Sequence, residues 1–176
     1  MSPKKVFIII SILFLVTLGF LFYSNKEVKT NQFFSSGMSQ EVLKDAKIYK
    51  NIKYKFSFIH PITVQVREYD EGKGAATIIF EDLTNIRGFQ LFILPYLGTE
   101  ASEERFKRDV PSGVRLDEKP VTIHGVNGVA FFSKDDFLGD TFEVWFIKDG
   151  YLYEITTLEE NTDWLIAILN TWSFER

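Results

Sequence analysis

Two histidines, His60 and His124, are the only imidazoles in the chain. A metal site built from two histidines and one carboxylate would need both rings to converge with an Asp or Glu. The two histidines stand far apart in the sequence and lack the short paired spacing of metal ligands. His60 precedes Pro61 at a strand end and His124 opens a turn, so we interpret both as ordinary surface or turn histidines. The sequence therefore predicts no metal site.

Nucleophilic catalysis has equally little support in the sequence. The chain contains no cysteine, which excludes thiolate chemistry, disulfides and a lipid-modified cysteine. No Gly-x-Ser-x-Gly elbow occurs, and the segment 111–113 (PSG) follows a predicted helix as a turn. The segment 72–74 (GKG) lacks the rest of a phosphate loop and is typical of a hairpin. We predict no catalytic residue, no cofactor and no enzymatic activity.

One acidic stretch could bind an ion or transfer a proton. Asp135 and Asp136 could act as an acid/base pair in a cleft, and the surrounding loop 133–143 also holds Asp140 and Glu143. These clustered oxygens allow the hypothesis of weak Ca²⁺ binding, although their spacing does not match an EF-hand. Acidic side chains in a polar loop are more often simply solvated, and this is the interpretation we favour.

Aromatic residues are abundant, with 18 Phe, 7 Tyr and 3 Trp among 176 residues. Five of them, in three successive predicted strands, could line a ligand pocket or a docking face: Phe131, Phe132, Trp145, Tyr151 and Tyr153. Their alternate spacing favours core packing instead. The formal net charge is −4, and no dense Lys/Arg block occurs, which argues against nucleic acid as a partner.

The N-terminal part of the chain predicts a membrane anchor. Residues 6–23 (VFIIISILFLVTLGFLFY) carry no charge and would form a helix about 27 Å long, close to the hydrocarbon thickness of a bilayer. Lys4 and Lys5 precede this run, so the positive-inside rule keeps residues 1–5 in the cytoplasm. A cleaved signal peptide is the alternative. Residues 24–37 form a polar linker, and residues 38–176 form one extracytoplasmic domain. The predicted location is the cell membrane, as a single-pass protein of a bacterial cell envelope.

The domain alternates strand and turn patterns. Predicted strands begin at Tyr54, and the alternation of Ile62, Val64 and Val66 indicates a half-buried strand. Residues 88–96 and 141–148 are apolar on both faces, which predicts central strands covered on both sides. Hairpin turns are predicted at 70–74, 125–128 and 149–150.

Three helices are predicted around these strands. Ser39 caps a short helix that includes Val42, Leu43 and Ala46. Ser102 caps a second helix that ends before Pro111 and Gly113. The last helix starts at Asn161 or Thr162, and its apolar side chains must pack on a sheet: Trp164, Leu165, Ile168, Leu169 and Trp172. The predicted fold class is α+β, an antiparallel sheet of about six to seven strands covered by helices as an α/β/α sandwich.

The order of these elements resembles the PsbP, Mog1 and DcrB-like fold family over about residues 48–176. The segment 54–61 (YKFSFIHP) is similar to the aromatic-x-Phe-Ser-Phe-x-x-Pro opening of that family. The segment 150–155 (GYLYEI), followed by an amphipathic helix and Ser173-Phe174, is similar to its close. One departure is that Ile62-Thr63-Val64 stands where many members have a Trp after the proline. The resemblance implies a non-enzymatic domain that binds or helps assemble protein complexes at membranes.

The leading hypothesis is therefore a membrane-anchored extracytoplasmic, non-catalytic binding or assembly domain, PsbP-like, whose partner is a membrane or envelope protein. Two alternatives stay open. A small-ligand or lipid-binding envelope module would need an apolar cavity beside the two-sided strands. An envelope hydrolase would need a cleft that holds a histidine or two carboxylates with perturbed pKa values, assembled from distant loops.

Overall fold

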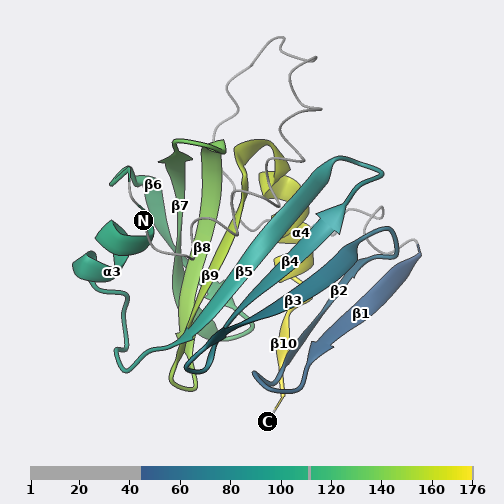
Figure 1. Ribbon diagram of the computed structural model, residues 1–176, viewed down its shortest axis with the longest axis horizontal. Coiled ribbons are helices and arrows are strands. Elements are labelled where there is room, and N and C mark those ends of the chain that lie inside the picture. Colours follow the sequence, from purple (N-terminus) through teal and green to yellow (C-terminus); the bar gives the residue numbers. More distant parts are fainter. Residues whose placement is uncertain (1–44, 111, 176) are drawn as a thin grey trace.

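A seven-stranded antiparallel sheet is the centre of the computed structural model, which describes residues 45–110 and 112–175 (Figure 1). The strand order is β3-β4-β5-β9-β8-β7-β6. In chain order the strands are β3 (Gln65–Gly72), β4 (Ala75–Asp82), β5 (Arg87–Pro95), β6 (Leu116–Ile123), β7 (Val126–Asp135), β8 (Gly139–Lys148) and β9 (Tyr151–Leu158).

Tight turns join most neighbouring strands of this sheet. Asp149 and Gly150 both have positive φ, 51° and 79°, which is the conformation that a two-residue hairpin requires, and the predicted β8–β9 turn is confirmed. The β6–β7 turn consists of His124 and Gly125, with φ of 45° and 82°. The prediction of a turn over 125–128 was wrong, because residues 126–128 already pair with β6.

A second, smaller sheet has the order β1-β2-β10 and consists of β1 (Ala46–Asn51), β2 (Phe56–Pro61) and β10 (Ser173–Phe174). β2 was predicted as a strand, but it belongs to this sheet rather than to the large one. Most of the short helix predicted after Ser39 lies outside the described residues, and Ala46 belongs to β1 instead. The strand predicted from Ile62 begins only at Gln65, because Ile62 donates its backbone N–H to Asp45 in a turn.

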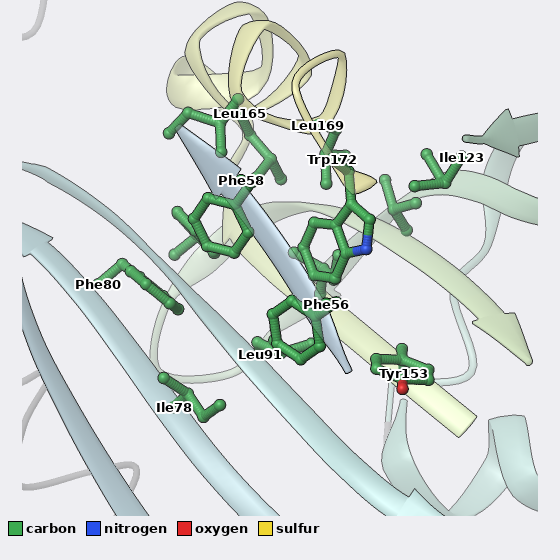
Figure 2. Packing of buried hydrophobic residues seen from close by; sticks show 14 of the residues in the cluster. Phe56, Phe58, Ile78, Phe80, Leu91, Ile123, Tyr153, Leu165, Leu169 and Trp172 are labelled. Atoms are coloured by element: carbon green, nitrogen blue, oxygen red, sulfur yellow. The ribbon is translucent and has the colours of Figure 1, made fainter. Parts of the chain in front are cut away.

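The inner face of the large sheet, defined as the face that bears Ile78, Phe80, Val144 and Ile155, packs on the small sheet and on helix α4 (Thr162–Leu169). A short 3-10 turn, η1 (Glu159–Asn161), leads into α4. The predicted apolar stripe of this helix is buried. Figure 2 shows rings and aliphatic chains from both sheets and α4 meeting around Trp172, which stacks on Phe56 at 4.5 Å between ring centroids.

The outer face of the same sheet, defined as the face that bears Thr77, Ile79, Glu143 and Trp145, is covered by helix α3 (Glu103–Asp109) over β7 and β8. The predicted cap is confirmed, because the Ser102 side chain accepts a hydrogen bond from the Arg105 backbone N–H. The ring of Phe106 stacks on Trp145 at 4.6 Å, and Phe131 and Val110 complete this small cluster. Successive side chains of a strand point to opposite faces of the sheet, so each of these strands contributes residues to both the inner and the outer face.

The prediction of an antiparallel sheet with central strands 88–96 and 141–148 is confirmed, since β5 and β8 are flanked on both sides. The α/β/α arrangement is only partly confirmed, because the described domain is mostly β and has two short helices. Residues 6–23 and the linker 24–37 lie outside the described residues. Within residues 45–110 and 112–175, no helix is long and apolar enough to cross a membrane.

Candidate functional site

A cavity of about 380 Å³ lies on the outer face of the large sheet. Its floor comes from β4, β5, β9, β8 and β7, and part of its wall comes from α3. Because α3 is only seven residues long, it covers the β7–β8 side of the sheet and leaves the cavity over the middle strands. The apolar side chains that line it include Ile79, Phe92, Val110, Leu138 and Trp145.

The centre of the cavity floor is polar. Gln90 on β5 is paired in register with Thr156 on β9, and Thr156 is paired in turn with Glu143 on β8. These three residues therefore form one row across three adjacent strands, and all three line the cavity. The side-chain oxygen Oε1 of Gln90 is buried and has no hydrogen-bond partner. A buried acceptor without a donor is unusual and is often found at functional sites.

Glu143 is a buried carboxyl group held by neutral donors. Its Oε2 accepts hydrogen bonds from the Thr156 hydroxyl at 2.7 Å and from the Trp145 indole N–H at 3.3 Å. Its Oε1 accepts from the Thr141 hydroxyl at 3.2 Å. Burial raises the pKa of Glu143 to about 7, because these neutral donors only partly offset the loss of solvation.

A second buried carboxyl group, Glu154, is one strand away and belongs to an ion-pair cluster. The Arg105 guanidinium Nε lies 3.0 Å from Glu154 Oε1 and also pairs with Asp109. Burial is the main reason that the pKa of Glu154 is raised well above its usual value, and the nearby Asp109 charge adds to this effect. The Arg105 guanidinium thus pairs with one carboxylate on its own helix, Asp109, and with one on β9, Glu154. The second pair connects α3 to the sheet.

The histidines lie outside this cavity. His60 is only 3% exposed and packs beside Phe58 and Phe80, with its Nδ1 at 2.9 Å from the Pro61 carbonyl oxygen. The prediction of a surface or turn histidine was therefore wrong for His60, because the sheet of β2 buries its strand end. Burial lowers the pKa of His60. His124 is exposed in the β6–β7 turn, as predicted.

The acidic stretch 133–143 is a hairpin rather than an open loop. Asp135 accepts hydrogen bonds from the backbone N–H groups of Phe137 and Leu138, so its carboxylate caps the turn. Asp140 pairs with Lys134 at 3.6 Å, whereas Glu143 is buried in β8. Among the residues that the structure describes, no group of three or more Asp, Glu or His side chains is arranged to hold a metal ion. The Ca²⁺ hypothesis therefore gains no support from this hairpin.

The two glycine-containing segments considered in the sequence, 111–113 and 72–74, form turns. Ser112 accepts a hydrogen bond from the Val114 N–H, and 72–74 belongs to the β3–β4 hairpin.

The five aromatic residues considered in the sequence are divided between the two faces of the large sheet. Phe131 and Trp145 are buried under α3, whereas Tyr153 belongs to the inner core with Phe132 and Tyr151 at its margin. Core packing is confirmed for the buried three, and only Trp145 of the five also lines the cavity.

The polar floor of the cavity was not predicted from the sequence. Glu143 had been noted only as part of a loop, and Gln90 and Glu154 had not been considered. A usable signal was present, since all three stand at positions of two-sided apolar strands where a polar side chain must be buried. Arg105, on the predicted helix after Ser102, is likewise buried at 8% exposure.

The described domain has a PsbP-like fold. It is similar to the solution structure of cyanobacterial PsbP (CyanoP) from Synechocystis sp. PCC 6803, with a TM-score of 0.56 and 12% sequence identity. The similarity covers 74% of this chain and 93% of the cyanobacterial chain. No protein-family model and no curated protein matches the sequence. The likeness at this identity concerns the fold alone.

Proposed function

We propose that this protein is a non-catalytic binding domain that takes a small ligand into the cavity on the outer face of its sheet. The cavity of about 380 Å³ carries the proposal, because it lies beside two-sided strands and combines apolar walls with a few polar groups. Its size is within the usual range for small-molecule sites, roughly 300–1,000 Å³. The PsbP-like fold supports a binding role by analogy only.

The remaining parts of the proposal concern location and partners. The uncharged run 6–23 supports an anchor that holds the domain on the outside of a cell membrane, where it would meet a membrane or envelope protein. Fractionation and protease protection of a chain tagged after Arg176 test this topology. A protected tag in intact cells, or a chain recovered entirely in the soluble fraction, would contradict the anchor.

Native mass spectrometry of the full chain, purified from native membranes in mild detergent, tests the cavity. We expect a bound small molecule on the wild-type protein and on Ile48→Trp, because Ile48 is exposed on β1 and does not line the cavity. Ile79→Trp places an indole in the cavity and should remove the bound mass. Equal bound mass on all three proteins, or none on any, would contradict the proposal, provided that melting curves show each protein folded.

An envelope hydrolase is the second candidate, and one observation favours it. Glu143 and Glu154 both line the cavity and both have raised pKa values, which is the carboxylate pair that such an enzyme would need. Against catalysis, Glu154 is bound to Arg105, and burial favours the neutral form of both groups, so neither serves readily as a base.

Hydrolysis of 4-nitrophenyl glycosides and esters by the full chain tests this second candidate. Turnover that is lost in both Glu143→Gln and Glu154→Gln would establish the enzyme and overturn the non-catalytic proposal. We expect no turnover above that of a heat-inactivated sample.

A further inference from the structure

Among the buried charged side chains that line the cavity, Glu143 alone has no ion-pair partner in the part of the chain that the structure describes. Three of the four basic residues that line the cavity already pair with carboxylates: Arg105 with Glu154 and Asp109, Lys134 with Asp140, and Arg87 with Asp82. The fourth, Arg108, is exposed to solvent on α3. On the acidic side, Glu81 pairs with Arg67, the part-exposed Glu71 accepts a hydrogen bond from the Thr77 hydroxyl, and the Asp135 carboxylate caps a turn.

Glu143 has no such cation. Its three hydrogen-bond donors are two hydroxyls and an indole, and within residues 45–110 and 112–175 no Lys or Arg forms an ion pair with it. A carboxylate has about four lone-pair sites, so one site stays open after these three bonds. A buried carboxylate without a cation is expensive, which makes this position a favourable place for a positive charge from outside the chain.

Gln90 adds a second unused acceptor on the same face. It stands two strands from Glu143 in the same cross-strand row, with Thr156 between them. Its buried Oε1 has no donor in the structure. The floor therefore offers two unused acceptor sites, and a primary ammonium group supplies three donors together with a positive charge.

The walls indicate what else the ligand must carry. Ile79, Phe92 and Trp145 line the same cavity, and aliphatic and aromatic side chains favour an apolar or aromatic body. A carboxylate or phosphate ligand would instead face Glu143 at short range in a poorly solvated site, where like charges repel strongly. Anionic lipids and nucleotides are therefore disfavoured.

We propose that the cavity binds a cationic amphipathic molecule, in which an apolar or aromatic body carries a protonated amine that bonds to the Glu143 carboxylate and the Gln90 side-chain oxygen. This inference rests on the proposed ligand-binding function and names the chemical class of the ligand. The buried carboxyl group, the unused acceptor and the apolar walls all come from one cavity.

Calorimetric titration with three probes of one shape tests the ligand class. Tryptamine, tryptophol and indole-3-acetate share an indole and differ in the charge of the side chain, which is positive, neutral and negative. The full chain is titrated in lipid nanodiscs at about pH 8, where Glu143 is ionised and the amine remains protonated. Empty nanodiscs provide the blank for partition into lipid.

We expect tryptamine to bind about ten- to a hundredfold more tightly than tryptophol, the range for a hydrogen bond to a charged group, and indole-3-acetate to bind most weakly. Glu143→Gln should reduce the preference for tryptamine to about twofold or less. Gln90→Met, which removes the second acceptor, should weaken tryptamine several-fold and leave tryptophol less affected. Glu118→Gln is the matched control, because Glu118 is exposed on β6 outside the cavity, and it should change nothing.

The outcomes separate this inference from the proposed function. Equal binding of the three probes, blocked by Ile79→Trp, would overturn the amine preference and leave a general ligand cavity. Tighter binding of indole-3-acetate than of tryptamine would overturn it in the same way. No binding of any probe above the blank, on a folded protein, would count against the ligand-binding function itself and against the inference that depends on it.

Discussion

The two faces of one sheet differ more than any other two regions of this molecule. On the inner face, β4, β8 and β9 contribute apolar residues such as Ile78, Val144 and Ile155, all with 0% exposure. On the outer face, the same three strands contribute Thr77, Glu143 and Glu154. Since successive residues of a strand point to opposite faces, both environments are encoded in one stretch of sequence.

The difference shows which layer stabilises the fold and which is available for binding. Stacked rings fill the inner face, including Phe80 on Phe89 at 4.4 Å and Phe146 on Tyr153 at 4.7 Å. Close packing of this kind is where truncation is most costly. The outer face keeps a cavity and buried polar groups, which are less stabilising but can recognise a ligand.

Neighbouring isoleucines on β4 give the most direct test of this contrast. Ile78 is fully buried in the inner core, whereas Ile79 lines the outer cavity. We expect Ile78→Ala to lower the free energy of unfolding by roughly 3–4 kcal/mol, because it opens a void in a packed core. Ile79→Ala only enlarges an existing cavity and should cost roughly 1–2 kcal/mol. Urea unfolding of both variants measures the difference, and equal losses would mean that the two faces are packed equally well.

Removal of the Arg105 charge should be the most damaging change on the outer face. Arg105→Met leaves Glu154 and Asp109 without their shared cation, and breaking a buried pair in this way typically costs about 3 kcal/mol or slightly more near neutral pH. The loss should shrink at acid pH, where both carboxyl groups become protonated. The double variant Arg105→Met/Glu154→Met should recover much of the stability in urea unfolding. A single variant as stable as the wild type would show that the ion pair contributes nothing.

Glu143→Gln should change the pH dependence of stability in a defined direction. The pKa of Glu143 in the folded protein, about 7, is above its ordinary value of 4.5, so folding favours the protonated form. Its contribution to stability is full below about pH 4.5 and is lost as the pH rises through about 7. The variant should therefore gain up to about 3 kcal/mol on the wild type between these limits.

Thermal melting of wild type and Glu143→Gln across this pH range measures the gain. Asp135, whose charge acts on Glu143, and Glu154, on the adjacent strand, both remain in the variant, so their contributions largely cancel in the difference. A stability difference that does not vary with pH would show that Glu143 is solvated or paired in the folded protein.

The inner face was the more predictable of the two. The alternation in residues 141–148, the Asp149-Gly150 turn and the apolar stripe of the last helix each follow from local rules, and all three are confirmed. The assignment of β2 to a second sheet was not predictable from its sequence, because the same alternation suits either sheet and the pairing with β1 and β10 is set by long-range packing.

The outer face was predicted less well for a physical reason. A glutamate inside an apolar strand, such as Glu154, signals burial, but the sequence does not show whether an arginine from a distant helix will reach it. Arg105 is 49 residues away in sequence and meets Glu154 only because α3 packs over β7 and β8, next to β9. The cavity likewise results from the shortness of α3 relative to the sheet, which local patterns do not report.

Ser102→Ala should have the smallest effect and should act on the outer face alone. The Ser102 hydroxyl accepts a hydrogen bond from the Arg105 backbone N–H, so its loss leaves one helix N–H unpaired and should cost about 1 kcal/mol. Because α3 is a single seven-residue helix, the loss should loosen that helix rather than the sheet. Hydrogen exchange should therefore speed up in residues 103–109 and stay unchanged in β4 and α4. Ser102→Asp, which restores a side-chain acceptor at the helix start, should return the exchange rates to the wild-type values. Faster exchange throughout the inner core would instead show that the two faces unfold as one unit. The faces would then differ in amino-acid composition but not in local stability.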